Sequence, residues 1–211
     1  MSNFGFMHLR VVRPYDLAFR EARSAVGALG LLKNAEMFPT VAKAIGDCSL
    51  AIGTTAVGAR QIEHPVHRLE DGGALIGAHL ETGRVALLFG SEKRGLSNDD
   101  LSYCHWLMRI PTRAEHDSMN LGQAVAICLY ELIRTDGAKG AADVPSEGTS
   151  SGEELERLTR ALLEALTASG YTKPGTEAMT EEKTRRLVRR LNLTSSDAET
   201  LTGMLAKMRR R

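Results

Sequence analysis

The sequence predicts an α/β protein with a parallel sheet, followed by a small all-helical module. Short apolar runs alternate with helical patterns from about residue 9 to residue 134. The runs are nearly continuous in apolar residues, which is typical of parallel strands covered on both faces. A stretch rich in Gly, Ala, Ser and Asp then separates them from a region where every pattern is helical. We therefore predict a first domain at 1–135, a flexible linker at 136–152 and a helical module at 153–211.

Four apolar runs are expected to form the strands of the first domain. In chain order they are His8–Val12, Ser49–Thr54, Val85–Phe89 and Trp106–Ile110. Two helical patterns lie between the first two runs, around Ala18–Leu29 and Thr40–Ile45, and Thr40 is a suitable N-cap.

Two further helices follow the later strands. Ser97-Asn-Asp-Asp100 has the spacing of a capping box, so a short helix should begin there. A longer helix is expected over Leu121–Arg134, with Val125, Leu129 and Leu132 near one face.

The helical module is expected to contain three helices. The first carries leucines at helical spacing, at Leu155, Leu158, Leu162 and Leu166, and Gly170 is placed to end it. The second is predicted over Thr180–Leu191. Ser196-Asp-Ala-Glu199 reads as a capping box for the third, whose predicted apolar face is Leu201, Met204, Leu205 and Met208.

Composition gives no sign of a membrane or of a strong global field. The chain has 27 Lys and Arg against 26 Asp and Glu, a net charge of +1. Its three cysteines share no metal or redox spacing and read as buried free thiols. No run approaches the ~18 apolar residues that span a bilayer, and the first residues lack a signal-peptide pattern. We predict a soluble, cytoplasmic protein.

The most informative segments are two loops that each connect a strand to a helix. They cover Phe89–Ser97 and Ile110–Leu121. If their strands are parallel neighbours, both loops lie at the carboxyl edge of the sheet, where open α/β sheets bind ligands. Gly53-Thr-Thr-Ala56 would bring a third loop to the same edge.

Each loop also has a purely structural interpretation. Gly90-Ser-Glu-Lys-Arg-Gly95 is neither a phosphate loop nor a GxGxxG fingerprint, so it could be an ordinary turn with Glu92 solvated. Ser118 or Asn120 could simply cap the helix that follows. The same geometry would let free N–H groups, a hydroxyl and an amide orient a substrate.

Histidines and basic residues complete the candidates. The histidines show no metal-ligand spacing and no HExxH or GxSxG occurs, so we assign no metal and discount a hydrolase. Helical spacing predicts that Arg186, Arg189 and Arg190 share one side of a helix. That side is either a solvated face or a surface that contacts RNA phosphates.

The two loops and the helix after them resemble the SpoU branch of the SPOUT RNA methyltransferases. The resemblance rests on Leu87–Ser97, Cys104, Ile110-Pro, Ser118-Met-Asn-Leu and Ala124–Glu131, which are similar to the second and third motifs of that family. The tail around Arg189-Arg-Leu, with the helix after it, resembles the TrmJ-type tRNA 2′-O-methyltransferases.

The resemblance implies a parallel α/β sheet with a C-terminal trefoil knot, a homodimer, S-adenosylmethionine as cofactor and tRNA as substrate. By position it implies a cofactor site made of Thr54, Thr55, Ala56, Gly90, Ser91, Glu92, Ile110, Asp117, Ser118 and Met119. Ser118, Asn120 and Glu92 match positions implied in catalysis, and Ser118 matches a serine that helps to place the ribose.

The first motif of the family, with the arginine assigned as general base, has no match in this chain. Met1 aligns with the end of the helix that follows it, and Arg10 and Arg13 lie beyond it. A start set too late would explain this, and we favour it because the other motifs are intact. A shortened paralogue that binds RNA or cofactor without methylating is the alternative, and a different nucleotide-binding protein is a third. An exposed sheet edge and reduced stability relative to a form extended upstream are expected.

Overall fold

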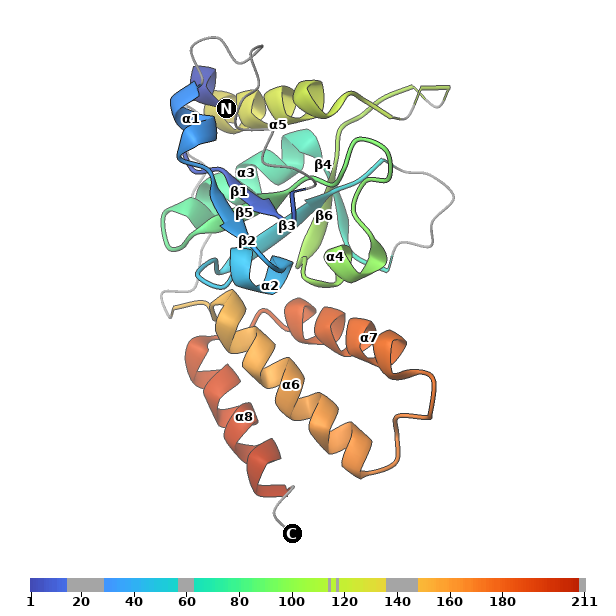
Figure 1. Cartoon of the computed structure of the whole chain (residues 1–211). Coiled ribbons are helices and arrows are strands. Elements are labelled where there is room, and N and C mark those ends of the chain that lie inside the picture. Colours follow the sequence, from blue (N-terminus) through green and yellow to red (C-terminus); the bar gives the residue numbers. More distant parts are fainter. Residues whose placement is uncertain (15–28, 57–62, 114, 117, 136–147, 209–211) are drawn as a thin grey trace.

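The computed structural model describes residues 1–14, 29–56, 63–113, 115–116, 118–135 and 148–208. The predicted helix around Ala18–Leu29 lies outside this part except for its last residue, which begins α1 (Leu29–Lys33). Figure 1 shows a mixed α/β part above a layer of helices formed by the C-terminal third of the chain. The predicted fold class, α/β with parallel sheets and a helical C-terminal region, is confirmed.

The central sheet has four strands in the order β4-β6-β3-β5, and all their pairings are parallel. They are β3 (Leu50–Thr54), β4 (Val66–Arg68), β5 (Val85–Leu88) and β6 (Trp106–Arg109). β3 lies in the middle and is buried along its length up to Thr54, as a near-continuous apolar run predicts. β4 and β5 are the edge strands of this sheet, and the four apolar residues of β5 are only half-buried.

A second, two-stranded sheet pairs β1 (Arg10–Val12) in parallel with β2 (Glu36–Phe38). All four predicted strands are therefore present, within a residue or two of their expected ends. β2 and β4 were not predicted, because each has only three residues and includes charged ones.

Helices cover both faces of the central sheet. On one face α3 (Leu69–Leu80) and α5 (Leu121–Thr135) place Leu69, Ile76 and Cys128 against Ile52 and Met108. On the other face α2 (Val41–Ala44) contributes to a core cluster around Ala51 and Tyr103. Both predicted caps are confirmed: Thr40 accepts from the N–H of Lys43, and Ser97 with Asp100 forms the capping box of α4 (Asn98–Ser102).

The helical module contains α6 (Gly152–Ala168), α7 (Glu177–Arg190) and α8 (Ser195–Met208). Leu155 and Leu158 of α6 form its core with Val188 and Ala198, and Gly170 at a φ of 74° follows the end of α6. The predicted helices and the leucine face of α6 are thus present in the structure.

Three expectations for this region were wrong in detail. The end of the predicted linker is ordered: Ser150 is buried, and Ser151 with Glu154 forms a capping box for α6. The residue that caps α8 is Thr194, which accepts from the N–H of Asp197, rather than Ser196. Only Leu205 of the predicted α8 face packs on the module core, while Leu201, Met204 and Met208 are exposed.

The module docks at the amino edge of the central sheet. The N–H of Gly152 donates to the carbonyl of Cys48, just before β3, at 2.8 Å, and that of Glu153 donates to Gly46 at 2.9 Å. α7 contacts α4, the helix that leads into β6. The module therefore lies opposite the edge at which β3, β5 and β6 end.

Candidate functional site

Three loops leave the carboxyl edge of the sheet side by side. The hydroxyl of Thr54, at the end of β3, donates to the carbonyl of Leu88 at the end of β5 at 3.0 Å. The N–H of Thr55 donates to Met108 of β6 at 3.0 Å. The loops that follow these strands therefore begin within a few ångströms of one another, as their positions in the sequence predicted.

The loop after β5 is a tight turn that closes on itself. Ser91 pairs with Gly95, whose N–H donates to the carbonyl of Ser91 at 2.8 Å. Gly95 has a φ of 66°, and a Cβ on Gly90 would lie 1.9 Å from the carbonyl carbon of Gly95. Glycine is thus required at Gly90 by close backbone approach and favoured at Gly95 by its φ.

Asn120 connects this turn to the helix α5. Its side-chain oxygen accepts from the N–H groups of Gly122 at 2.9 Å and Gln123 at 3.3 Å, so Asn120 caps α5. Its amide nitrogen donates to Glu92 at 2.8 Å. Asn120 therefore acts as a cap and as a bridge between the two loops, and Ser118 is exposed beside it.

At this edge the residues next to the core are apolar, and polar residues lie nearer the solvent. Phe89 and Ile110 are half-buried and pack on the main core cluster, and Met119 is half-buried. Thr55 is half-buried, and Ala56 and Ser91 are exposed. Asp117 lies outside the described residues. The other predicted cofactor positions fall on these three loops, which could hold a flat, partly apolar ligand with a polar end.

Buried titratable side chains elsewhere are structural. The ring nitrogen Nδ1 of His105 accepts from the N–H of Ala51 at 3.0 Å, and burial lowers the pKa of His105 to about 3. The thiols of Cys48, Cys104 and Cys128 are free and buried, and burial raises the pKa of Cys104 to about 12. Among the described residues no group of His, Cys, Asp or Glu could hold a metal ion. No described helix has the length and apolar character to cross a membrane.

The three arginines expected on one RNA-contacting side of α7 do not share a surface. Arg189 is 1% exposed and faces the carbonyl of Gly152, because Thr184, Arg185, Val188 and Arg189 form the buried face of the helix. Arg186 is largely buried and pairs with Glu63 at 2.9 Å. Arg190 is exposed. The prediction that the three arginines share one accessible side of the helix is therefore wrong, and burial lowers the pKa of Arg189 to about 10.

Sequence reasoning did not identify Arg185, which is 2% exposed and has several acidic partners. The i, i+4 pair with Glu181 was readable, but the partners from α4 and α6 are far away in sequence.

The fold and these loops define an α/β protein with a candidate ligand site at the carboxyl edge of a parallel sheet. Residues 1–130 match the family described as the SpoU rRNA Methylase family, and the chain belongs to that family.

Relatives with curated names extend the match beyond the α/β part. The tRNA (cytidine/uridine-2'-O-)-methyltransferase TrmJ of Klebsiella pneumoniae is 31% identical over 214 residues, which cover 99% of this chain and 87% of the relative. The protein of the same name from Sodalis glossinidius is 31% identical over 212 residues, covering 99% and 83%.

Solved structures agree with these matches. TrmJ from Z. mobilis ZM4 has a TM-score of 0.85 and 32% identity, covering 99% of this chain and 90% of that one. A probable methylase family protein from Haemophilus influenzae Rd KW20 has a TM-score of 0.60 and 25% identity, covering 100% and 87%. The similarity thus includes the helical module, and the family resemblance seen in the sequence is confirmed.

Proposed function

We propose that this protein transfers a methyl group from S-adenosylmethionine to a ribose 2′-hydroxyl in tRNA. The observation that carries the proposal is the joining of three loops at one sheet edge, with the Glu92–Asn120 hydrogen bond between two of them. Membership of the SpoU family and the names of the TrmJ relatives give the reaction and the substrate class. A cytoplasmic location is part of the proposal, because tRNA is modified there.

The residues at this edge fit S-adenosylmethionine. Half-buried Phe89, Ile110 and Met119 offer apolar surface to an adenine, while turn backbones at Thr55 and Ser91 offer donors and acceptors. Glu92, held by the amide of Asn120, would supply a carboxylate that can pair with a positively charged group of the cofactor. When bound, the cofactor supplies an electrophilic methyl group on a good leaving group.

The protein must therefore mainly align the attacking ribose oxygen. Correct orientation of two reactants can supply up to ~7–11 kcal/mol of a barrier. Ser118 is exposed next to the Asn120 cap, where its hydroxyl can donate to or accept from a ribose hydroxyl. Asn120 and Glu92 hold the loops that carry these groups. Asp117, which also belongs to the proposed cofactor set, lies outside the described residues.

A trefoil knot formed by the segment after β6 belongs to this proposal. Support comes from the closeness of the loops after β3, β5 and β6, which share one edge although they are distant in sequence. A TM-score of 0.85 to a TrmJ structure supports the same path of the chain.

A homodimer is also part of the proposal, with α5 as its contact surface. Ile127, Tyr130 and Ile133 are 38%, 52% and 41% exposed, and they lie on one outer side of α5. A shallow groove next to them is lined by Phe4, Leu80 and Leu132, among others. Such a contiguous apolar face on a monomer usually marks a protein contact.

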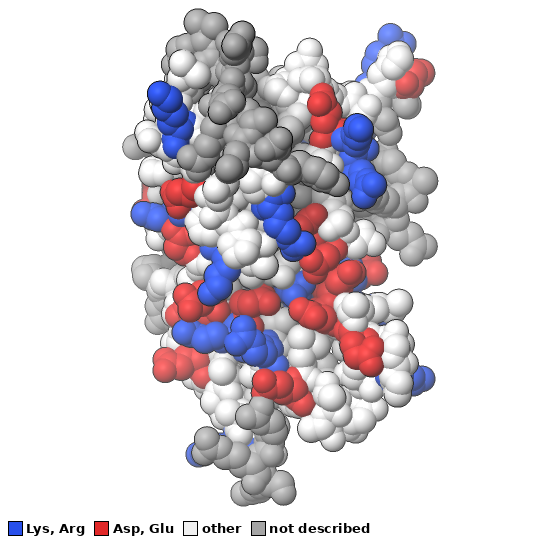
Figure 2. All heavy atoms as spheres, in the orientation of Figure 1, with Lys and Arg blue, Asp and Glu red and all other residues white. Residues whose placement is uncertain are grey.

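For tRNA we propose contacts from Arg190 and from the accessible part of Arg186. Arg189 is buried and is not among the proposed contacts. Figure 2 shows basic and acidic side chains intermixed over one face of the molecule. RNA binding by a few local contacts is consistent with the net charge of +1.

The test combines binding and transfer. S-adenosylmethionine binding is measured by calorimetry, and transfer of labelled methyl to unmodified tRNA is measured with digestion to locate 2′-O-methyl nucleosides. We expect cofactor binding by this chain, and transfer by a form extended upstream that is assayed beside it. Binding of cofactor and tRNA without transfer at high enzyme would favour the inactive paralogue, and no cofactor binding would refute the proposal.

Ser118→Ala provides a sharper test of the site. We expect transfer to fall about 10- to 100-fold, because a positioned hydroxyl is lost, with little change in melting temperature. The matched control is Ser169→Ala at the far end of α6, whose hydroxyl bonds to Leu166 and which should leave transfer unchanged. Equal transfer by the two variants would remove Ser118 from the site.

A further inference from the structure

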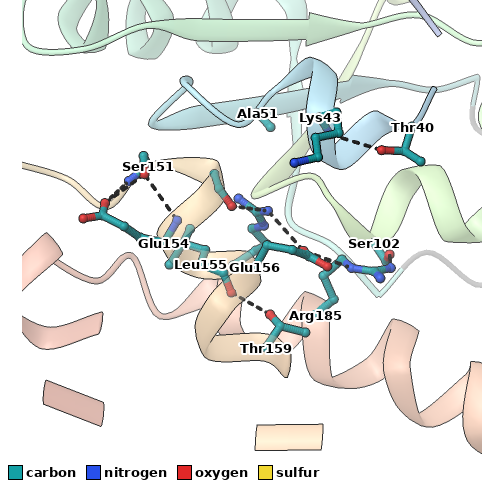
Figure 3. A network of polar contacts seen from close by, with 12 residues as sticks. Thr40, Lys43, Ala51, Ser102, Ser151, Glu154, Leu155, Glu156, Thr159 and Arg185 are labelled. Atoms are coloured by element: carbon teal, nitrogen blue, oxygen red, sulfur yellow. Dashed lines mark hydrogen bonds and ion pairs between the residues drawn. The ribbon is translucent and has the colours of Figure 1, made fainter. Parts of the chain in front are cut away.

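A cluster of charged side chains around two buried arginines joins the helical module to the α/β part. We call it the Arg185 cluster. It consists of Arg185 and Arg189 with Asp99, Glu156, Glu181 and Tyr103. Figure 3 shows Arg185, Glu156 and Ser102 of this network at the boundary between the helices and the α/β part. Both arginines are at most 2% exposed, which is unusual for this residue type.

Arg185 contacts three different helices. Its Nη1 donates to Asp99 at 3.0 Å and to the hydroxyl of Ser102 at 2.8 Å, both on α4. Its Nε lies 3.5 Å from Glu156 of α6, and its Nη2 pairs with Glu181 of α7. The guanidinium also lies 4.0 Å above the ring of Tyr103, which follows α4. Arg185 thus fixes the position of α4 relative to the module.

α4 is in turn continuous with the turn that contains Gly90 and Glu92. Leu96 at the end of that turn, Leu101 in α4 and Cys104 after it form one buried cluster with Leu107 of β6. Gly90 lies in close contact with Gly95 and Leu96. A shift of α4 should therefore move Leu96, and it should also move Gly90, because the backbone of Gly90 lies directly against Gly95 and Leu96.

Stability alone is a weak reason for this arrangement. Removing an arginine from water is costly, and apolar side chains of similar volume often stabilise a protein as well or better. Burial lowers the pKa of Arg185, but Glu156, Tyr103 and the other acidic partners outweigh this and raise it, so Arg185 is charged. A charged fork with directed bonds to two groups on one helix fixes geometry in a way that apolar contact does not.

We propose that Arg185 is a positioning residue that holds α4 and, through it, the turn at residues 90–95 in the geometry that binds the cofactor. The second half of this statement rests on the proposed function. The first half concerns only the order of the turn and is testable without any ligand.

The experiment uses variants that remove single contacts of Arg185 from either side. Ser102→Ala and Asp99→Asn weaken its bonds to α4, while Glu181→Gln weakens only its bond within α7 and serves as the matched control. All three are small changes and should fold even if Arg185→Met does not. Hydrogen exchange of peptides covering 89–97 and, as a reference, 69–80 is measured by mass spectrometry, together with the S-adenosylmethionine Kd.

We expect the two α4 variants to speed exchange in 89–97 about tenfold and to raise the cofactor Kd by a similar factor, with 69–80 unchanged. Glu181→Gln should change neither, although it lowers the melting temperature. Equal exchange in 89–97 for all three variants, or a Kd that follows melting temperature alone, would overturn the proposal. If the unaltered protein does not bind S-adenosylmethionine, the proposed function fails, and the exchange data still decide whether Arg185 orders the turn.

Discussion

The two edges of the central sheet are built on opposite physical principles. The carboxyl edge is made of short turns that are held together by close backbone contact and by one capping side chain. Gly90 lies against Gly95, and Asn120 caps α5 while it donates to Glu92. The amino edge is held by charged side chains around the buried Arg185, whose partners Asp99 and Glu181 are about half exposed. The first edge is half-exposed and open to a ligand, and the second is closed. The contrast separates exposed polar groups, which lie at the candidate site, from buried arginines, which join the helical module to the α/β part.

The largest expected effect tests whether the two buried arginines are equivalent. Arg185→Met should lower the free energy of unfolding by about 3–5 kcal/mol, because it removes two hydrogen bonds from a charged donor to α4, those to Asp99 and Ser102. Arg189→Met should change it by less than about 1 kcal/mol, because two of the Arg189 nitrogens have no hydrogen-bond partner. Urea denaturation at pH 7 measures both values. Similar losses for both variants would contradict the picture of a junction centred on Arg185.

A substitution in the turn at Gly90 should show how far stability and cofactor binding depend on the backbone geometry of the carboxyl edge. Gly90→Ala should cost about 2–3 kcal/mol of unfolding free energy and strongly weaken S-adenosylmethionine binding, since its Cβ would overlap Gly95 and Leu96. Thermal unfolding and calorimetry measure the two effects. The control is Gly203→Ala in α8, where a Cβ meets nothing within 4 Å, and helix propensity should stabilise it by up to about 1 kcal/mol.

Acid should weaken the amino edge through His105. Because burial lowers its folded pKa to about 3 while the unfolded value is about 6.5, the unfolded chain binds the extra proton first as pH falls. Stability is therefore present above pH ~6.5 and declines below it, by about 2 kcal/mol between pH 7 and pH 5. Denaturation at both pH values measures the decline. His105→Asn keeps an acceptor for the N–H of Ala51 and should reduce the loss of stability between pH 7 and pH 5. The loss that remains should come from His64 and His79, whose pKa values burial also lowers.

The smallest effect separates the two roles of Asn120. Asn120→Ala should cost about 1 kcal/mol through loss of the α5 cap. Asn120→Asp keeps the cap but replaces the donor to Glu92 with a second carboxylate, so it should cost less in stability and more in cofactor affinity. Unfolding experiments and calorimetry measure the two quantities. If loss of stability and loss of cofactor affinity stood in the same ratio in both variants, the bond from Asn120 to Glu92 would have no separate role.

The sequence predicted the carboxyl edge better than the amino edge. The loops could be read because strand ends, glycines and caps are local signals, and the capping box at Ser97 and the strand β3 lie as predicted. Arg189 was misread because helical spacing shows which residues share a side but not which side is buried. That information lies in residues distant in the sequence, such as Gly152, whose carbonyl accepts from Arg189. The strands β2 and β4 were missed because three residues carry too little periodicity.

The edge strand β5 has a consequence for handling the protein. Its residues Val85, Ala86, Leu87 and Leu88 are all apolar and half-exposed, and β3 is the strand paired with it in the central sheet. No lysine, proline or bulge interrupts the run, and Arg84 flanks it at its amino end. Concentrated samples should therefore associate slowly through this strand, and a growing β signal on storage would appear without any loss of the helical module.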